Sequence, residues 1–202
     1  MNPTEILKNE HRVIEQVLDC LEAIVKGCAA TGKLDRQAAK DAVDFFRTFA
    51  DGCHHAKEET HLFPAMEARG FARESGPVAV MLSEHEQGRA HLRAMDGAIE
   101  AASAGDPEAL GRFVDHAKAY TALLRHHIEK EDHCLFPMAD EALSGEDQLA
   151  LLEAFEKVET HAPGTHERYL AIAGALAGQY GVPHSTAVGG APSHRGTCGC
   201  KH

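Results

Sequence analysis

Hydrophobic residues recur along most of the chain at the three- and four-residue spacing of amphipathic helices, with polar residues between them. The first such stripe follows Asn2-Pro3, where asparagine suits a helix N-cap and proline suits the first helical position. It continues to about Gly32. A second helix is predicted over about 35–69, with a kink or a loosened turn at Pro64.

Two more long helices and two shorter ones are predicted downstream. Gly76-Pro77 opens the third helix, and Asp106-Pro107 opens the fourth, with aspartate as the cap. Short linkers join the long helices, which favours antiparallel neighbours in an up-down-up-down arrangement. The shorter helices are expected near 147–160 and 165–179, and the composition from Gly181 onward predicts a flexible tail.

These predictions define an all-α protein with three parts. An antiparallel up-down four-helix bundle is expected over 1–143, a short helical extension over 144–180, and a tail containing His and Cys over 181–202. A chain of 202 residues fits one domain with a sizeable core. Aromatic residues make up only 5% and tryptophan is absent, which favours helices over a β-sandwich.

The helical pattern contains a repeat of histidine and glutamate positions. The segment CHHAKEETHLFP, which starts at residue 53, matches HHIEKEDHCLFP, which starts at residue 126, at an offset of 73. A Glu-His pair precedes each copy, and these two pairs are offset by 74. Two repeats of a Glu-His segment followed by His-x-x-x-Glu provide four histidines and two carboxylates: His11, His54, Glu58, His85, His127 and Glu131.

These six residues are predicted to form a metal site. Residues four apart on a helix project to the same side, so each His-x-x-x-Glu pair can point into the bundle, and His11 and His85 lie in the inward stripes of the other two helices. Imidazole and carboxylate ligands suit iron, manganese or zinc. Six such ligands exceed what one tetrahedral zinc needs, and they suit two octahedral irons that share both carboxylates and keep open positions.

Other interpretations of these residues are weaker. Histidines in an apolar stripe can simply be hydrogen-bonded core residues, but two unpaired buried carboxylates would then cost several kcal/mol each. The helix at His85 begins like that of a zinc protease, but Arg89 stands where the second histidine is needed. Glu58 and His61 have the Glu-x-x-His spacing of ferritin-type sites, yet the repeat places Cys134 opposite His61.

The six residues and both Leu-Phe-Pro segments resemble the hemerythrin-like family, also called HHE cation-binding domains. The resemblance covers residues 3–143 and implies an antiparallel four-helix bundle with a non-haem di-iron centre at one end. It also implies that Glu58 and Glu131 are bridging carboxylates. The implied iron ligands are His11 and His54 on one ion and His85 and His127 on the other.

The chain departs from the oxygen-carrying members of that family. Those proteins have His-x-x-x-His on the third helix, which gives five histidines, whereas this chain has Arg89 at the second position. Their His-x-x-x-x-Asp on the fourth helix can be met by His127 and Asp132, although the repeat favours Glu131. A four-histidine site is more like that of the iron-centre repair and iron-sensing members, which favours reaction with oxygen, peroxide or nitric oxide over reversible oxygen storage.

Several neighbours of the predicted site have two interpretations. Glu15 is expected to be a solvated or outer carboxylate rather than a ligand, and Tyr120 is expected to line the core, with metal contact as its alternative. The Cys198-Gly199-Cys200 segment is either a second metal-binding element or a tail without a metal. Four further histidines are expected to be exposed, off the inward face: His55, His61, His126 and His133.

Charge and composition limit the partners and the location. A net charge of -11 argues against nucleic acid and anionic membranes as partners, and no apolar run is long enough to cross a membrane. The six cysteines do not form a disulfide pattern, and the amphipathic N-terminus does not resemble a signal peptide, so a cytoplasmic location is expected. The sequence does not indicate whether the protein has a protein partner.

The expected function is that of a non-haem di-iron protein, with oxo- or hydroxo-bridged irons, that binds or senses oxygen, nitric oxide or peroxide. Two alternatives stay open at this point. One is an enzyme that uses the same irons as a peroxidase, a nitric oxide reductase or an iron-centre repair factor. The other is metal storage or buffering. All of them need the same six ligands.

Overall fold

The computed structural model describes residues 2–160 and 164–185. Every regular element in these two ranges is helical, which confirms the predicted all-α class. None of the described helices combines the length and the apolar composition needed to cross a membrane. The predicted tail, including Cys198-Gly199-Cys200, lies outside the described residues from position 186 onward.

Four long helical segments follow one another along the chain, and two shorter helices follow them. The first is α1 (Pro3–Thr31). The second consists of α2 (Arg36–Phe45), η1 (Phe46–His55), η2 (Glu58–Leu62) and α3 (Phe63–Ala68). The third is α4 (Gly76–Ser103), and the fourth consists of α5 (Pro107–Lys130), η3 (Glu131–Leu135) and α6 (Phe136–Ala142). The shorter helices are α7 (Gly145–Thr160) and α8 (Thr165–Tyr180).

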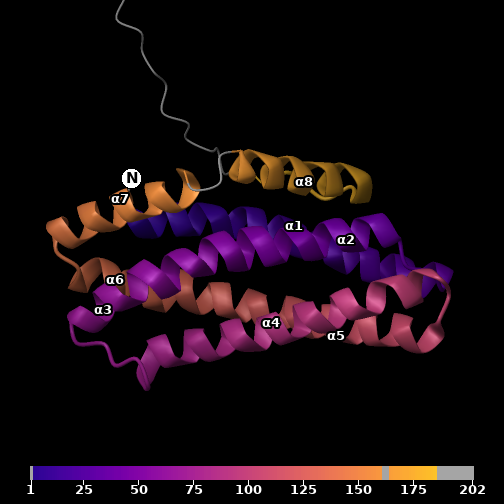
Figure 1. Ribbon diagram of the computed structural model, residues 1–202, viewed down its shortest axis with the longest axis horizontal. Helices are drawn as coiled ribbons and strands as arrows, with labels where there is room; N and C mark the ends of the chain where they lie inside the picture. Colours follow the sequence, from indigo (N-terminus) through magenta and orange to yellow (C-terminus); the bar gives the residue numbers. More distant parts are fainter. Residues whose placement is uncertain (1, 161–163, 186–202) are drawn as a thin grey trace, which may run out of the picture.

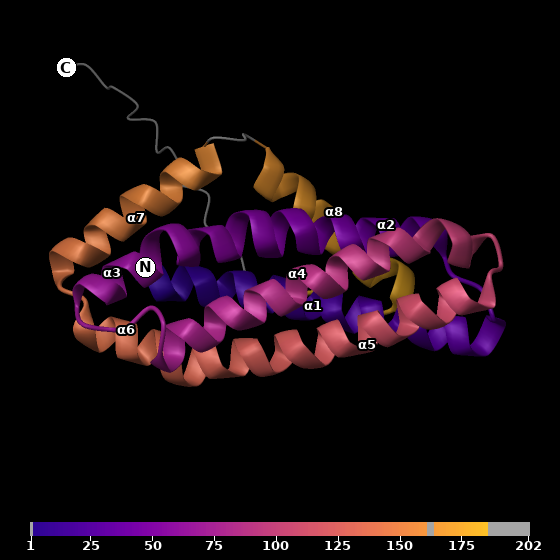
Figure 2. The ribbon, with the colours of Figure 1, turned by 60° about the horizontal axis from the view of Figure 1, so that its bottom comes forward.

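The four long segments lie side by side, and successive segments run in opposite directions (Figure 1). Helices α1 and α4 each contact both α2 and α5, so the four segments enclose a common interior. Helix α8 packs across α1 and α2, and α7 contacts α1 and η2, so these two helices cover one side of the long segments (Figure 2).

Local side-chain chemistry accounts for the ends of the helices. The Asp106 carboxylate accepts hydrogen bonds from the backbone N–H groups of Glu108 and Ala109, at 2.9 and 3.1 Å, which caps α5. Gly32 ends α1 with a φ of 66°, in the left-handed region that glycine adopts without strain. The predicted helix starts at Pro3, Gly76 and Pro107 agree with the structure.

The second and fourth segments each contain a widened, π-helical turn just before a proline. The backbone N–H of Phe63 donates to the carbonyl of Glu58, and that of Phe136 donates to the carbonyl of Glu131, five residues back in both cases. The following prolines lack an N–H and crowd the preceding turn, so the helix loosens there instead of stopping. The loosened turn predicted before Pro64 is present.

A polar layer separates two apolar clusters inside the helices. The larger cluster includes Ile14, Phe46 and Tyr120, and the smaller cluster includes Leu7 and Phe136. In each long segment, the predicted metal ligands lie between residues of the larger cluster and residues of the smaller one. The candidate site is therefore sealed from above and below by packed hydrophobic side chains.

Candidate metal centre

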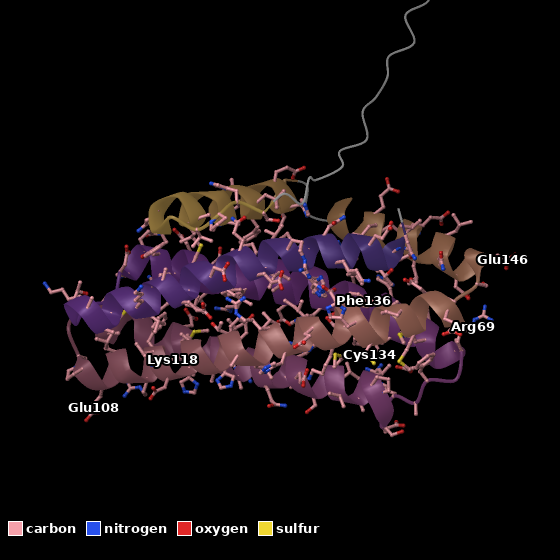
Figure 3. The ribbon with its side chains drawn as sticks, turned by 180° about the vertical axis from the view of Figure 1, so that it is seen from behind. Arg69, Glu108, Lys118, Cys134, Phe136 and Glu146 are labelled. Carbon is pink, nitrogen blue, oxygen red and sulfur yellow. The ribbon has the colours of Figure 1, made fainter. Side chains whose placement is uncertain are left out.

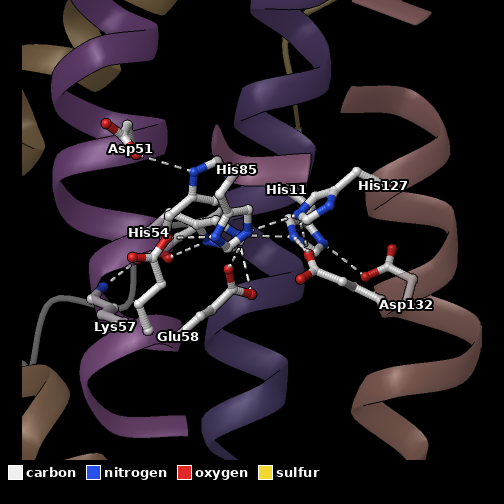
Figure 4. Close-up of polar contacts among 12 residues, drawn as sticks. His11, Asp51, His54, Lys57, Glu58, His85, His127 and Asp132 are labelled. Carbon is white, nitrogen blue, oxygen red and sulfur yellow. Dashed lines mark hydrogen bonds and ion pairs between the residues drawn. The ribbon is translucent and has the colours of Figure 1, made fainter. Parts of the chain in front are cut away.

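All six predicted ligands are buried and converge in this polar layer. They come from all four long segments, and each lies on the face of its segment that points to the common interior. Figure 4 shows five of them side by side around one centre: His11, His54, Glu58, His85 and His127. Exposed fractions range from 0% to 1% for His11, His54, Glu58, His85, His127 and Glu131.

The four histidines form two pairs that face each other through their Nε2 atoms. Nε2 of His11 lies 3.0 Å from Nε2 of His54, and Nε2 of His85 lies 3.1 Å from Nε2 of His127. Two nitrogen ligands about 2.1 Å from one metal ion and at right angles to each other lie about 3 Å apart. Both pairs therefore have the separation expected of two ligands on one ion.

Each carboxylate reaches both histidine pairs. The two oxygens of Glu58 lie 3.6 Å from Nε2 of His54 and 3.5 Å from Nε2 of His85. Oε2 of Glu131 lies 3.2 and 3.3 Å from Nε2 of the other histidine of each pair. The arrangement has an approximate twofold symmetry, with both carboxylates placed between the pairs.

Outside this cluster, a second carboxylate holds the other ring nitrogen of each histidine. A histidine that donates its Nδ1 proton to a carboxylate keeps the lone pair of Nε2 free, and this is the usual support of metal-binding histidines. The pairs, with their Nδ1–oxygen distances, are His11 with Asp132 (2.8 Å), His54 with Glu10 (2.9 Å), His85 with Glu59 (2.6 Å) and His127 with Glu84 (3.0 Å).

Two lysines complete this outer layer. Lys57 forms an ion pair with Glu10, and Lys130 forms one with Glu84. The Lys57 side chain is 1% exposed, whereas that of Lys130 is 41% exposed. Burial would raise the pKa of Glu10, but the hydrogen bond from His54 and the charge of Lys57 outweigh it and lower the pKa to about 2.

The sequence analysis missed the role of these outer residues, although the repeat contained the signal. Glu10 and Glu84 are the glutamates of the two Glu-His pairs, and Glu59 and Asp132 match each other at the offset of 73. Both matched positions hold a histidine from another helix. Asp132 thus supports a ring from outside, and Glu131 is the carboxylate that faces the centre.

Aromatic rings fix two of the histidines from the side of the smaller cluster. Phe136, labelled in Figure 3, stacks on His11 with ring centres 5.4 Å apart. Phe63, its counterpart in the repeat, stacks on His85 at 6.0 Å. These rings restrict the rotation of the imidazoles, which preserves the direction of their Nε2 atoms.

The donor set fits a pair of metal cations. All four carboxylate oxygens of Glu58 and Glu131 are buried without a hydrogen-bond partner among the described residues. Burial and the nearby charge of Glu131 raise the pKa of Glu58 well above its usual value. Burial would also raise the pKa of Glu131, but the charges of His127 and His11 outweigh it and lower that pKa. Two cations between the carboxylates would satisfy these oxygens.

One prediction about the neighbouring residues was wrong. His55 is only 5% exposed, and its ring stacks on that of His85 with centres 3.8 Å apart. It lies at the end of η1, where the wide turn rotates successive residues through smaller angles than an α-helix does, so His54 and His55 both face inward. Burial lowers the pKa of His55 to about 4.

The other neighbours lie at or near the surface, except for Tyr120, which is buried. His126 and His133 are exposed, as predicted, whereas His61, for which the same was predicted, is half-buried. Glu15 pairs with Arg12 on the surface of α1, at 2.9 Å. Tyr120 lines a small cavity of about 10 Å³ together with His55, His85 and His127, among others, which is room for about one water-sized molecule.

Fold and site together define an all-helical protein with a buried histidine–carboxylate cluster suited to metal cations. The family model of the hemerythrin HHE cation-binding domain matches residues 2–139 of this chain. The chain therefore belongs to that family, which confirms the resemblance seen in the sequence.

The curated relatives carry no functional description. The uncharacterized proteins Mb2018 of Mycobacterium bovis and Rv1995 of Mycobacterium tuberculosis are each 25% identical to this chain over 155 residues. The aligned region covers 77% of this chain and 60% of each relative. No solved structure gives a significant match.

Proposed function

We propose that this protein binds two iron ions in a hemerythrin-type antiparallel four-helix bundle. His11 and His54 would hold one ion, His85 and His127 would hold the other, and Glu58 and Glu131 would bridge them. One observation carries the proposal: four carboxylate oxygens lie buried without a hydrogen-bond partner in the part of the chain that the structure describes, and each carboxylate reaches both histidine pairs.

The donor set favours iron over a single zinc. Structural zinc takes four ligands in a tetrahedron, whereas six donors shared between two ions leave both ions short of six-coordination. Two bound irons supply redox chemistry and open positions for small ligands such as oxygen, nitric oxide or peroxide. We propose binding or sensing of such ligands as the function, in the cytoplasm and without nucleic acid or membrane partners.

The surrounding residues would orient the ligands and exclude water. Glu10, Glu59, Glu84 and Asp132 hold the Nδ1 protons, so that each Nε2 lone pair points inward. Lys57 balances the buried charge of Glu10. The two apolar clusters limit access to molecules of small size.

The test is iron content per chain, measured together with the visible spectrum before and after dithionite and air. About two irons, with charge-transfer bands that bleach and return, would support the proposal. Glu131→Ala should lose the two-iron form, and His133→Ala, an exposed histidine two residues away, should keep it. Full occupancy in Glu131→Ala, or zinc as the resident metal, would refute it.

A further inference from the structure

The symmetry of the centre fails at one inward-facing residue, His55. The repeat places Ile128 at the matching position, and Leu124 at the position that matches Asp51. Ile128 is 2% exposed and Leu124 is 4% exposed, so both are ordinary core residues. One side of the centre therefore has an additional imidazole and carboxylate where the other side has two apolar side chains.

His55 has the same arrangement as the four predicted histidine ligands. Its Nδ1 lies 3.4 Å from the Asp51 carboxylate, and its Nε2 is buried without a hydrogen-bond partner among the described residues. His55, Glu58, His85 and His127 each present one ligand atom, and these atoms lie within 4.8 Å of one another. A carboxylate behind one nitrogen and an unsatisfied second nitrogen are what a metal ligand needs.

Arg89 supports this arrangement from outside. Its guanidinium donates to Asp51 at 2.8 Å and to Glu59 at 2.7 Å, and these two carboxylates stand behind His55 and His85. Asp51 and His85 can be found in Figure 4 on the same side of the centre. Arg89, four residues after His85 on α4, thus orients a histidine supplied by η1 through Asp51.

We propose that His55 is a fifth histidine ligand, which binds through Nε2 to the ion held by His85 and His127. This inference rests on the proposed two-metal centre. It makes the two metal positions different, with three nitrogen donors on one ion and two on the other. Asp51 and Arg89 are then positioning residues, because they act on the metal only through His55.

The test is ⁵⁷Fe Mössbauer spectroscopy of the full chain loaded with iron. The wild-type protein should show two distinct quadrupole doublets of equal area. His55→Ile, which copies the residue at the matching position, should bring the two doublets together and lower the affinity for one iron by at least about 10-fold. Because isoleucine fills the same buried space with an apolar side chain, this variant should fold.

Two further variants make the result decisive. His55→Ala should respond to added imidazole by recovering the second doublet, since free imidazole can enter the space left by the side chain. His126→Ala, which removes an exposed histidine next to His127, should leave both doublets unchanged.

The outcomes separate this inference from the proposed function. Two irons in the wild type, with spectra of His55→Ile and His55→Ala identical to it, would overturn the assignment of His55 and leave the two-iron centre standing. A wild-type protein that does not take up two irons would overturn both. Recovery of the second doublet by imidazole in His55→Ala would support a ligand role. If His55 had only a structural role, added imidazole would not restore the doublet.

Discussion

Replacement of Glu58 by glutamine should make the metal-free protein more stable and the iron-loaded protein less stable. The Glu58 side chain is fully buried, its oxygens have no hydrogen-bond partner among the described residues, and it faces a second carboxylate, Glu131. Glutamine keeps the size of the side chain and removes the charge. Burial and Glu131 raise the pKa of Glu58, so the metal-free protein must either bury this charge or protonate the carboxyl, and glutamine removes that cost.

The magnitude follows from the burial of the charge. Replacement of buried ion pairs by uncharged residues of similar volume stabilises proteins by up to about 1–4 kcal/mol, and we expect the low end of this range for a single carboxylate. For a chain of this size, about 1 kcal/mol shifts Tm by about 2–4 °C. The metal-free Glu58→Gln variant should therefore melt at least about 2 °C above the metal-free wild type.

The assay is thermal unfolding followed by circular dichroism, with chelator and then with excess iron. Glu129→Gln is the matched control, because it makes the same chemical change at an exposed position close to Glu131. Its effect should stay within about 0.5 kcal/mol. The reasoning would be refuted if the metal-free Glu58→Gln variant melted below the metal-free wild type. It would also be refuted if this variant, given iron, bound two irons as tightly as the wild type does.

Three other results are expected. Chelation of the wild-type protein should lower its Tm, because a ligand present at about 100 times its Kd stabilises the native state by about 2.7 kcal/mol, and an unchanged Tm would contradict a native metal site. Lys57→Met should lower the free energy of unfolding in urea by about 3–5 kcal/mol, because it leaves Glu10 buried without its cation. Lys130→Met, at a half-exposed position, should lower it by less than about 1 kcal/mol, and equal losses would contradict this account. Hydrogen bonds from Arg36 and Lys40 lower the pKa of Glu100 to about 2, below its value in the unfolded chain. Its contribution is therefore complete above about pH 4.5 and lost as the pH falls toward 2, so the stabilities of wild type and Glu100→Gln should converge in acid, and a constant difference would refute this.

Much of the helical framework could be predicted because its signals are local. Proline and aspartate at helix starts, glycine at a helix end, and the loosened turn before Pro64 all depend on residues within one or two turns. The inward orientation of the six predicted ligands depends on helical periodicity and was visible for the same reason. Whether they bind iron stays a prediction for the experiments above.

The position of His55 could not be predicted in this way. An α-helical period places it off the inward face, and only the π-helical turn of η1 brings it beside His54. A widened turn depends on how the segment packs as well as on the proline downstream. The role of Arg89 was equally hidden, because its partners Asp51 and Glu59 belong to another helical segment.

The sequence by itself determined the helices, most of the residues on each inner face and the repeated set of four histidines and two glutamates. It did so because helix geometry relates residues three or four positions apart. The tertiary structure alone decided that Asp132 supports His11 from 121 positions away and that the His55 ring stacks on that of His85. Such contacts depend on how far each helix is rotated and shifted against its neighbours, and side-chain packing in the assembled interior sets both.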